Sequence, residues 1–161
     1  MNTNWNDVLS VYLELSGDES TLSEIKLDGA TPEQLVECET KIGMKLPTEL
    51  RDFYSYSNGL ALEDDRTKEP RFLRQIQILP AYVKFARESF AETHQKYARR
   101  YLPFIDWENG DSSGYLLDAT GAYRPEIFIF LHEHYEYIEE QDINEFLQPF
   151  AESLANFFTQ S

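Results

Sequence analysis

The sequence predicts an α+β domain whose sheet is mostly antiparallel and flanked by helices. Helical periodicity dominates the first part of the chain, short strand-like segments separated by tight turns follow residue 101, and a last helical pattern closes the chain. Turns this short leave no room for a crossover helix, so the strands that they join must be antiparallel. The 161 residues, 42% of them hydrophobic, suit one compact domain over residues 1–161.

Helix start and stop signals define the N-terminal elements. Thr31 can cap a helix that Pro32 begins, and Gln34 can complete a capping box. The expected helices run from Trp5 to the residue before Gly17, with Asn4 as the cap, from Thr31 to Ile42 before Gly43, and from Pro47 to the Asn58-Gly59 pair. A short strand is expected at Ser23–Leu27.

Alternating and apolar runs predict the remaining elements. Residues 72–79 alternate and are expected to form a strand that Pro80 ends, and residues 81–100 a long helix with most of its basic residues outside. Further strands are expected over residues 102–107, 115–119 and 126–131, with a candidate fourth at 135–140. A closing helix is expected from Ile143 to Phe158, although Pro149 lies inside it.

The chain is strongly acidic, with 14 basic and 29 acidic side chains and a net charge of −15. Nucleic acid and anionic membrane surfaces bind through lysine and arginine, so both are disfavoured as partners. Residues 71–103 carry seven bases against two acids, whereas residues 104–161 carry one base against twelve acids. Such a field would steer a basic protein toward the chain, or it serves solubility alone.

Cysteine usage and the N-terminus bear on location. Cys38 is the one cysteine, which excludes an internal disulfide framework and a cysteine-based zinc site. It falls on the apolar face of a predicted helix, so we interpret it as a core residue rather than a nucleophile. The N-terminus lacks the features of a signal peptide, and no apolar run approaches a membrane span, so a cytoplasmic location is expected.

No catalytic constellation stands out. His132 and His134 would lie on one side of a strand, a spacing that metals use, and Glu136 would continue that face; without a complete ligand set, a structural or surface role is preferred. The segment DWENGDSSG departs from the calcium-loop pattern and is interpreted as a turn. Nucleophile-elbow, dinucleotide and phosphate-loop motifs are absent. The sequence therefore predicts neither catalysis nor a metal or other cofactor.

The stretch ETKIGMKLPTELRDFYSYSNG resembles the N-terminal motif of the SUKH superfamily, which includes fungal cell-wall-synthesis regulators and many bacterial immunity proteins. The matching residues are Glu39, Gly43, Leu46, Pro47, Phe53, Asn58 and Gly59. LPFIDWENGDSSGYLLDA is similar to the family's strand–turn–strand, with Gly110, Asp111 and Asp118 in matching places. EIFIFLHEH and DINEFLQPFAESL are similar to its next strand and closing helix, so the resemblance covers about residues 31–154.

The resemblance implies an α+β fold with a central antiparallel sheet and a non-catalytic, protein-binding role. In bacteria this usually means an immunity protein that binds and blocks a toxin of a polymorphic or contact-dependent system. Many such toxins are nucleases with basic surfaces, which an acidic inhibitor would suit. A regulatory or scaffolding domain, as in the fungal relatives, is the alternative, and a metal-dependent protein using His132 and His134 is a third hypothesis.

Acidic residues on loops and turns are the expected contacts for a protein partner. Each of them is equally well explained as a solvated charge, since a few residues usually carry an interface. The candidates are Glu63, Asp64, Asp65, Asp106, Glu108 and Asp111, followed by Glu136, Glu139 and Glu140.

Overall fold

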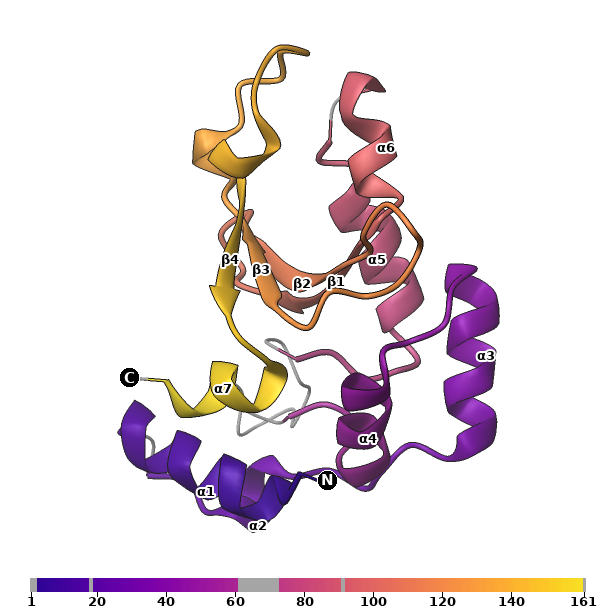
Figure 1. Cartoon of the computed structure of the whole chain (residues 1–161). Coiled ribbons are helices and arrows are strands. Elements are labelled where there is room, and N and C mark those ends of the chain that lie inside the picture. The colour runs from indigo at the N-terminus through magenta and orange to yellow at the C-terminus, as the bar shows by residue number, and fades with distance from the viewer. Residues whose placement is uncertain (1–2, 18, 61–72, 91, 161) are drawn as a thin grey trace.

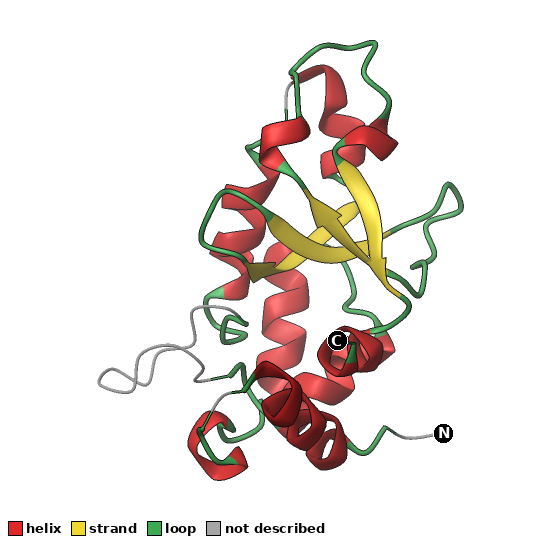
Figure 2. Ribbon diagram, turned by 90° about the vertical axis from the view of Figure 1, so that its left-hand side faces the viewer, coloured by secondary structure: helices red, strands yellow, loops and turns green. Residues whose placement is uncertain are grey.

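The computed structural model describes residues 3–17, 19–60, 73–90 and 92–160. In this part of the chain, helices surround an antiparallel sheet, which confirms the predicted α+β class (Figures 1 and 2). The α-helices are α1 (Trp5–Ser16), α2 (Leu22–Ile25), α3 (Pro32–Ile42), α4 (Thr48–Tyr56), α5 (Leu79–Arg87), α6 (Gln95–Ala98) and α7 (Leu154–Thr159). The 3-10 helices are η1 (Glu92–His94), η2 (His132–His134) and η3 (Ile143–Glu145). The strands are β1 (Tyr101–Asp106), β2 (Ser112–Leu116), β3 (Ile127–Phe130) and β4 (Leu147–Ala151).

The sheet has the strand order β1-β2-β3-β4, and each strand pairs antiparallel with the next one along the chain. β1 and β2 approach each other so closely at Gly114 that a β-carbon there would lie 1.9 Å from the carbonyl oxygen of Leu102. Only glycine fits at this position. At the other side of the sheet, Pro149 lies in β4 opposite Phe128, beside an irregularity in the register of β3 and β4.

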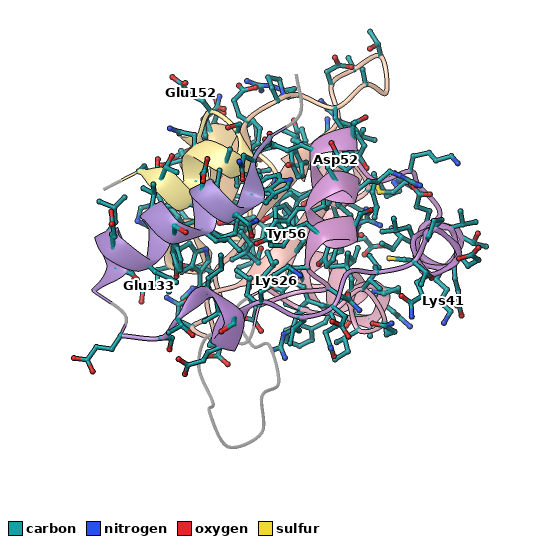
Figure 3. All side chains as sticks on the ribbon, turned by 90° about the horizontal axis from the view of Figure 1, so that it is seen from below. Lys26, Lys41, Asp52, Tyr56, Glu133 and Glu152 are labelled. Atoms are coloured by element: carbon teal, nitrogen blue, oxygen red, sulfur yellow. The ribbon has the colours of Figure 1, made fainter. Side chains whose placement is uncertain are left out.

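Figure 1 shows α1, α2, α4 and α7 gathered below the sheet, with α5 and α6 beside it. α5 packs on β1, where the hydroxyl of Tyr82 donates to the carbonyl oxygen of Ile105 at 3.1 Å. Figure 3 shows Lys26 next to Tyr56, and its Nζ lies 4.7 Å from the centre of the ring. This cation–π contact connects the residue after α2 to the end of α4.

Two clusters of buried side chains hold these elements together. In the larger cluster, Phe53 of α4 meets Trp5 of α1 edge-on at 5.1 Å between ring centroids and stacks on Phe158 of α7 at 5.7 Å. Through these two contacts Phe53 joins three helices that are distant in the sequence. Burial of each such ring contributes about 1.5–3 kcal/mol to the stability of the fold. The smaller cluster gathers aromatic rings around Phe90 and Phe146.

Most of the predicted start and stop residues of the N-terminal helices take their expected roles. The side chain of Asn4 accepts from the N–H of Asp7, and Thr31 and Gln34 form the capping box of α3. Gly43 ends α3 at φ 85°, a left-handed conformation that glycine adopts without strain. The helices predicted from Trp5, Thr31 and Pro47 are confirmed. The stop predicted at Asn58-Gly59 is wrong, since α4 ends at Tyr56 and the extended Ser57 is its C-cap.

Two predicted strands in the first half of the chain are wrong. Residues 23–25 of the expected strand Ser23–Leu27 lie in α2, because Glu24 accepts from the N–H of Thr21 at 3.0 Å and so begins a helix. In the predicted strand 72–79, Leu73 makes an isolated bridge to β1, and the chain then turns into α5. The N–H of Ile76 donates to the side chain of Asn58 at 2.7 Å. This N–H is therefore used in a bond to a residue distant in the sequence and not in a bond between strands.

Three predictions in the second half also need correction. The helix expected over residues 81–100 is divided into α5, η1 and α6, since the N–H of Phe90 bonds to a carbonyl three residues back and its ring turns into the smaller cluster. Residues 135–140 form a loop, not a strand. The closing helix expected from Ile143 is replaced by η3, β4 and the shorter α7, and Pro149 lies in a strand.

Candidate functional site

Three of the predicted acidic residues lie around one groove between α5 and the turn at residues 107–111. The groove has a volume of about 340 Å³. The turn side contributes Asp106, Glu108 and Asp111, and the helix side contributes Tyr82, Phe85 and Ala86. Phe85 is 70% exposed, an unusual position for a phenylalanine, so the groove has an accessible aromatic wall opposite its carboxylates.

Asp106 ends β1 and is held on both oxygens. Its Oδ2 accepts from the guanidinium of Arg74 at 2.7 Å, and its Oδ1 accepts from the N–H of Glu108 at 2.8 Å. Arg74 thus balances one of the three carboxylates, and the second bond fixes the start of the turn. This ion pair joins the basic segment, residues 71–103, to the acidic segment, residues 104–161.

Asp111 fixes the other end of the turn against η2. Its Oδ1 accepts from the backbone N–H of His132 at 3.0 Å and lies 2.5 Å from Nδ1 of the same residue. Gly110 has φ 98°, and a β-carbon there would lie 2.9 Å from the imidazole of His132. Residues 107–111 of the segment DWENGDSSG therefore form a turn in contact with η2, in agreement with the predicted turn. The last three residues of the segment belong to β2, so the strand expected over residues 115–119 instead runs from Ser112 to Leu116.

Glu108 differs from its two neighbours. Its side chain is exposed and makes no hydrogen bond or ion pair with any other residue that the structure describes. Its backbone has φ 61°, the left-handed region, which costs about 1–2 kcal/mol for a residue other than glycine. The turn therefore presents a free carboxylate from a strained position at the mouth of the groove.

Glu136, Glu139 and Glu140 do not line this groove. They lie exposed on the loop between η2 and η3, which projects at the top of Figure 1. The buried side chain of Gln141 closes the loop, since it accepts from the N–H of Glu136 at 2.8 Å and donates to the carbonyl oxygen of His134 at 2.6 Å. Tyr137, 60% exposed and also at φ 61°, lies among these acids.

Glu63, Asp64 and Asp65 lie outside the described residues. Six of the nine predicted contacts can therefore be placed. They form two groups, one at the groove and one on the projecting loop, and the pairing of Asp111 with His132 connects the first group to the base of the loop.

Comparison with known families decides what kind of protein carries these two surfaces. Residues 29–160 match the model of the SMI1 / KNR4 family (SUKH-1). The matched range includes both the groove and the projecting loop. The chain belongs to the SMI1/KNR4 family. The predicted resemblance to the SUKH superfamily is thereby confirmed. The family includes toxin immunity proteins and is generally non-catalytic. No curated protein matches the chain.

The motif by which this SMI1/KNR4 protein resembles its superfamily builds the link between α3 and α4. Glu39, only 5% exposed, accepts from the N–H of Leu46 at 2.7 Å and from the guanidinium of Arg51 at 2.5 Å. Burial raises the pKa of Glu39, but the bonds from Arg51 and Leu46 outweigh it, and the pKa lies below its ordinary value. Asn58 binds Ile76 at 2.7 Å, which positions the chain before α5.

The histidines of this SMI1/KNR4 protein are arranged differently from the prediction. His132 and His134 lie on a 3-10 helix instead of a strand, and His132 pairs with Asp111. In the described ranges no group of three or more His, Cys, Asp or Glu side chains is placed to hold a metal ion. Cys38 lies in the core as predicted, and burial, followed by the nearby Glu39 carboxylate, raises the pKa of its thiol to about 12.

Sequence reasoning missed Phe85. Phe85 and the neighbouring Ala86 are both apolar residues of the predicted helix, and the structure buries Ala86 and exposes Phe85. Helical spacing alone does not tell which of two adjacent apolar residues faces outward. Predicting this aromatic wall would have required the rotation of α5 about its own axis.

A second hollow lies on the opposite side of α5. It has a volume of about 400 Å³ and is lined by Lys84 and Arg87 together with Lys41 of α3, so the helix separates an acidic from a basic surface.

Within the residues that the structure describes, no helix of this SMI1/KNR4 protein is both long enough and apolar enough to cross a bilayer.

Proposed function

We propose that this SMI1/KNR4 protein is an immunity protein that binds and neutralises a cognate toxin of a polymorphic or contact-dependent system. The observation that carries the proposal is the groove in which Asp106, Glu108 and Asp111 face the exposed Phe85. Aromatic side chains are enriched in protein interfaces, and complementary charge steers a partner toward them. Membership of a family that includes toxin immunity proteins supports this assignment.

The proposed mechanism is occlusion without chemistry. A toxin that acts on nucleic acid needs a basic surface to bind phosphates. The net charge of −15 steers such a surface toward this chain, and the carboxylates then occupy the positions that phosphates would take. Asp106 and Asp111 are already fixed by Arg74 and His132, so little side-chain freedom is lost at these two positions on binding. The protein would act in the cytoplasm, where it would meet a toxin that has entered the cell.

The projecting loop is proposed as a second contact. Its carboxylates on Glu136, Glu139 and Glu140 surround Tyr137, and tyrosine gives large contact area at low cost in conformational entropy. Gln141 holds the loop in shape before binding, which reduces the ordering cost of association.

The test is capture of a partner followed by inhibition. The protein is used as bait in lysate of its own source at low and moderate salt, and any stoichiometric partner is purified and assayed for toxicity or nuclease activity. We expect a basic protein whose activity one equivalent of this chain abolishes. A partner that binds with unchanged activity would indicate the regulatory or scaffolding role instead. Absence of any stoichiometric partner at both salt concentrations would overturn the proposal.

Variants locate the contact once a partner is known. Glu108→Gln and the triple replacement of Glu136, Glu139 and Glu140 by glutamine should each weaken binding about tenfold or more, since charge-assisted hydrogen bonds are lost. Glu33→Gln removes an exposed charge from α3 and is the matched control. Charge reversal of residues 63–65 tests the remaining predicted acids, and an unchanged affinity would remove them from the site.

A further inference from the structure

We propose that the groove between α5 and the turn 107–111 is a slot for the side chain of one arginine. The inference rests on the proposed function for the origin of that arginine, which would belong to the partner protein. The slot itself follows from the lining of the groove and can be tested without any partner.

The lining has two chemically different sides. Phe85, Ala86 and Tyr82 form an apolar wall on α5, and Asp106, Glu108 and Asp111 form an anionic rim on the turn. A ligand that satisfies both sides needs an aliphatic stem and a cationic head. Arginine and lysine side chains have this composition, and the exposed ring of Phe85 offers a face for a cation–π contact.

The charge of the rim is not balanced from within the described chain. Arg74 forms an ion pair with Asp106, and within the described residues no lysine or arginine pairs with Glu108 or Asp111. The side chain of Glu108 has no hydrogen-bond or ion-pair partner among the described residues. Among the same residues, the side-chain hydrogen bonds that Asp111 accepts from His132 both end on Oδ1. A free carboxylate and a free carboxylate oxygen are thus available to a planar donor.

Guanidinium fits this arrangement better than ammonium. Its planar fork can donate two parallel bonds to a carboxylate while its face stacks on an aromatic ring, whereas ammonium is a compact point charge with strong hydration. Lysine would therefore use the rim but gain less from Phe85. We assign the slot to arginine on this ground.

Other classes of ligand fit less well. A metal ion needs several ligands at one point, and no such group exists in the part of the chain that the structure describes. A wholly apolar ligand would desolvate Glu108 without a partner, which is costly. An anion would be repelled by the rim. The volume of about 340 Å³ is at the lower end for ligand pockets, which suits one side chain better than a cofactor.

The test is a titration of the isotope-labelled protein with N-acetyl-arginine amide, followed by NMR chemical shifts. N-acetyl-citrulline amide, a neutral molecule of nearly the same shape, is the control ligand. We expect saturable shifts at Phe85, Glu108 and Gly110 with the arginine probe and none with citrulline. Glu108→Gln should weaken the arginine probe about tenfold, and Phe85→Ala should weaken it severalfold. Glu33→Gln, which removes an exposed carboxylate from α3, should leave the affinity unchanged.

Several results would overturn the assignment. Shifts spread over exposed carboxylates, with equal losses of affinity in Glu108→Gln and Glu33→Gln, would show unspecific ion pairing. An equal response to citrulline would show that charge plays no part, and tighter binding of N-acetyl-lysine amide would exclude the guanidinium assignment. A failed titration refutes the slot while neutralisation of a captured toxin can still be measured. A captured partner that keeps its activity refutes neutralisation while the titration stands.

Discussion

Removing the carboxylate of Glu39 should destabilise the fold by an amount that the structure lets us work out. Glu39 is buried and accepts from Leu46 N–H at 2.7 Å, and a hydrogen bond to a charged group contributes about 1.5–3 kcal/mol. Arg51 is 34% exposed, so water replaces much of its bond to Glu39, and that pair adds about 0–1 kcal/mol. We expect Glu39→Ala to lower the free energy of unfolding by about 3 kcal/mol.

Glu39→Gln separates charge from shape. The amide oxygen still accepts from Leu46, but the bond becomes a neutral one of roughly half the strength, so the expected loss is about 1.5 kcal/mol. Urea unfolding followed by circular dichroism at neutral pH measures both values. The control is Glu37→Gln on the same helix, an exposed residue 3.1 Å from Lys41, which should change the stability by less than about 0.5 kcal/mol.

The pH dependence gives a second, independent check. Because the pKa of Glu39 is lowered in the folded state, its stabilising effect is complete above its ordinary pKa of 4.5 and is lost as the pH falls through the lower folded value. The gap between wild type and Glu39→Gln should therefore be constant from neutral pH to about pH 5 and close at more acidic pH. Equal stabilities at neutral pH, or a gap that persists undiminished in acid, would refute the reasoning.

Three further predictions concern single sites. Glu108→Gly should stabilise the fold by about 1 kcal/mol in urea unfolding, because it relieves a left-handed backbone, and should weaken arginine binding in the groove at least as much as Glu108→Gln; a loss of stability would contradict the conformation described. Gly114→Ala should leave little folded protein by circular dichroism, because its β-carbon would meet the backbone of Leu102 at 1.9 Å, and a folded variant would show that β1 and β2 separate easily. Cys38 should react with a thiol reagent at neutral pH only at the rate of unfolding, as burial raises its pKa to about 12, and rapid labelling of the native protein would disprove its core position.

Sequence reasoning succeeded where the signal is local. The caps at Asn4 and Thr31 and the left-handed glycine at residue 43 each act within a few residues, and they predicted α1 and α3 correctly. It failed where a distant partner decides. Residues 147–158 have helical spacing of apolar side chains. Residues 147–151 nevertheless form a strand, because they pair antiparallel with the edge of β3 that β2 does not occupy. Asn58, which redirects residues 73–78, acts on a residue 18 positions away.

The candidate site was predictable in its chemistry but not in its geometry. Composition indicated acidic contacts and loops indicated where to look, and Asp106, Glu108 and Asp111 indeed come together at one groove. The sequence held no sign that Phe85 would face them, since this depends on the rotation of α5 against β1. Nor did it show that Arg74 and His132 would each engage one of the three carboxylates, leaving Glu108 alone without a described partner.

Pro149 bears on how the sheet ends. An edge strand offers unpaired N–H and C=O groups to any extended chain, including a second copy of the same protein, and this is a common route to aggregation. β4 is an edge strand of the described sheet, and a proline in its middle has no N–H to donate to a further strand. A register irregularity lies beside it, and irregularities of this kind disrupt the regular geometry that strand addition needs. The residue that interrupts an apparent helix in the sequence thus protects an open sheet from growing by recruitment of another molecule.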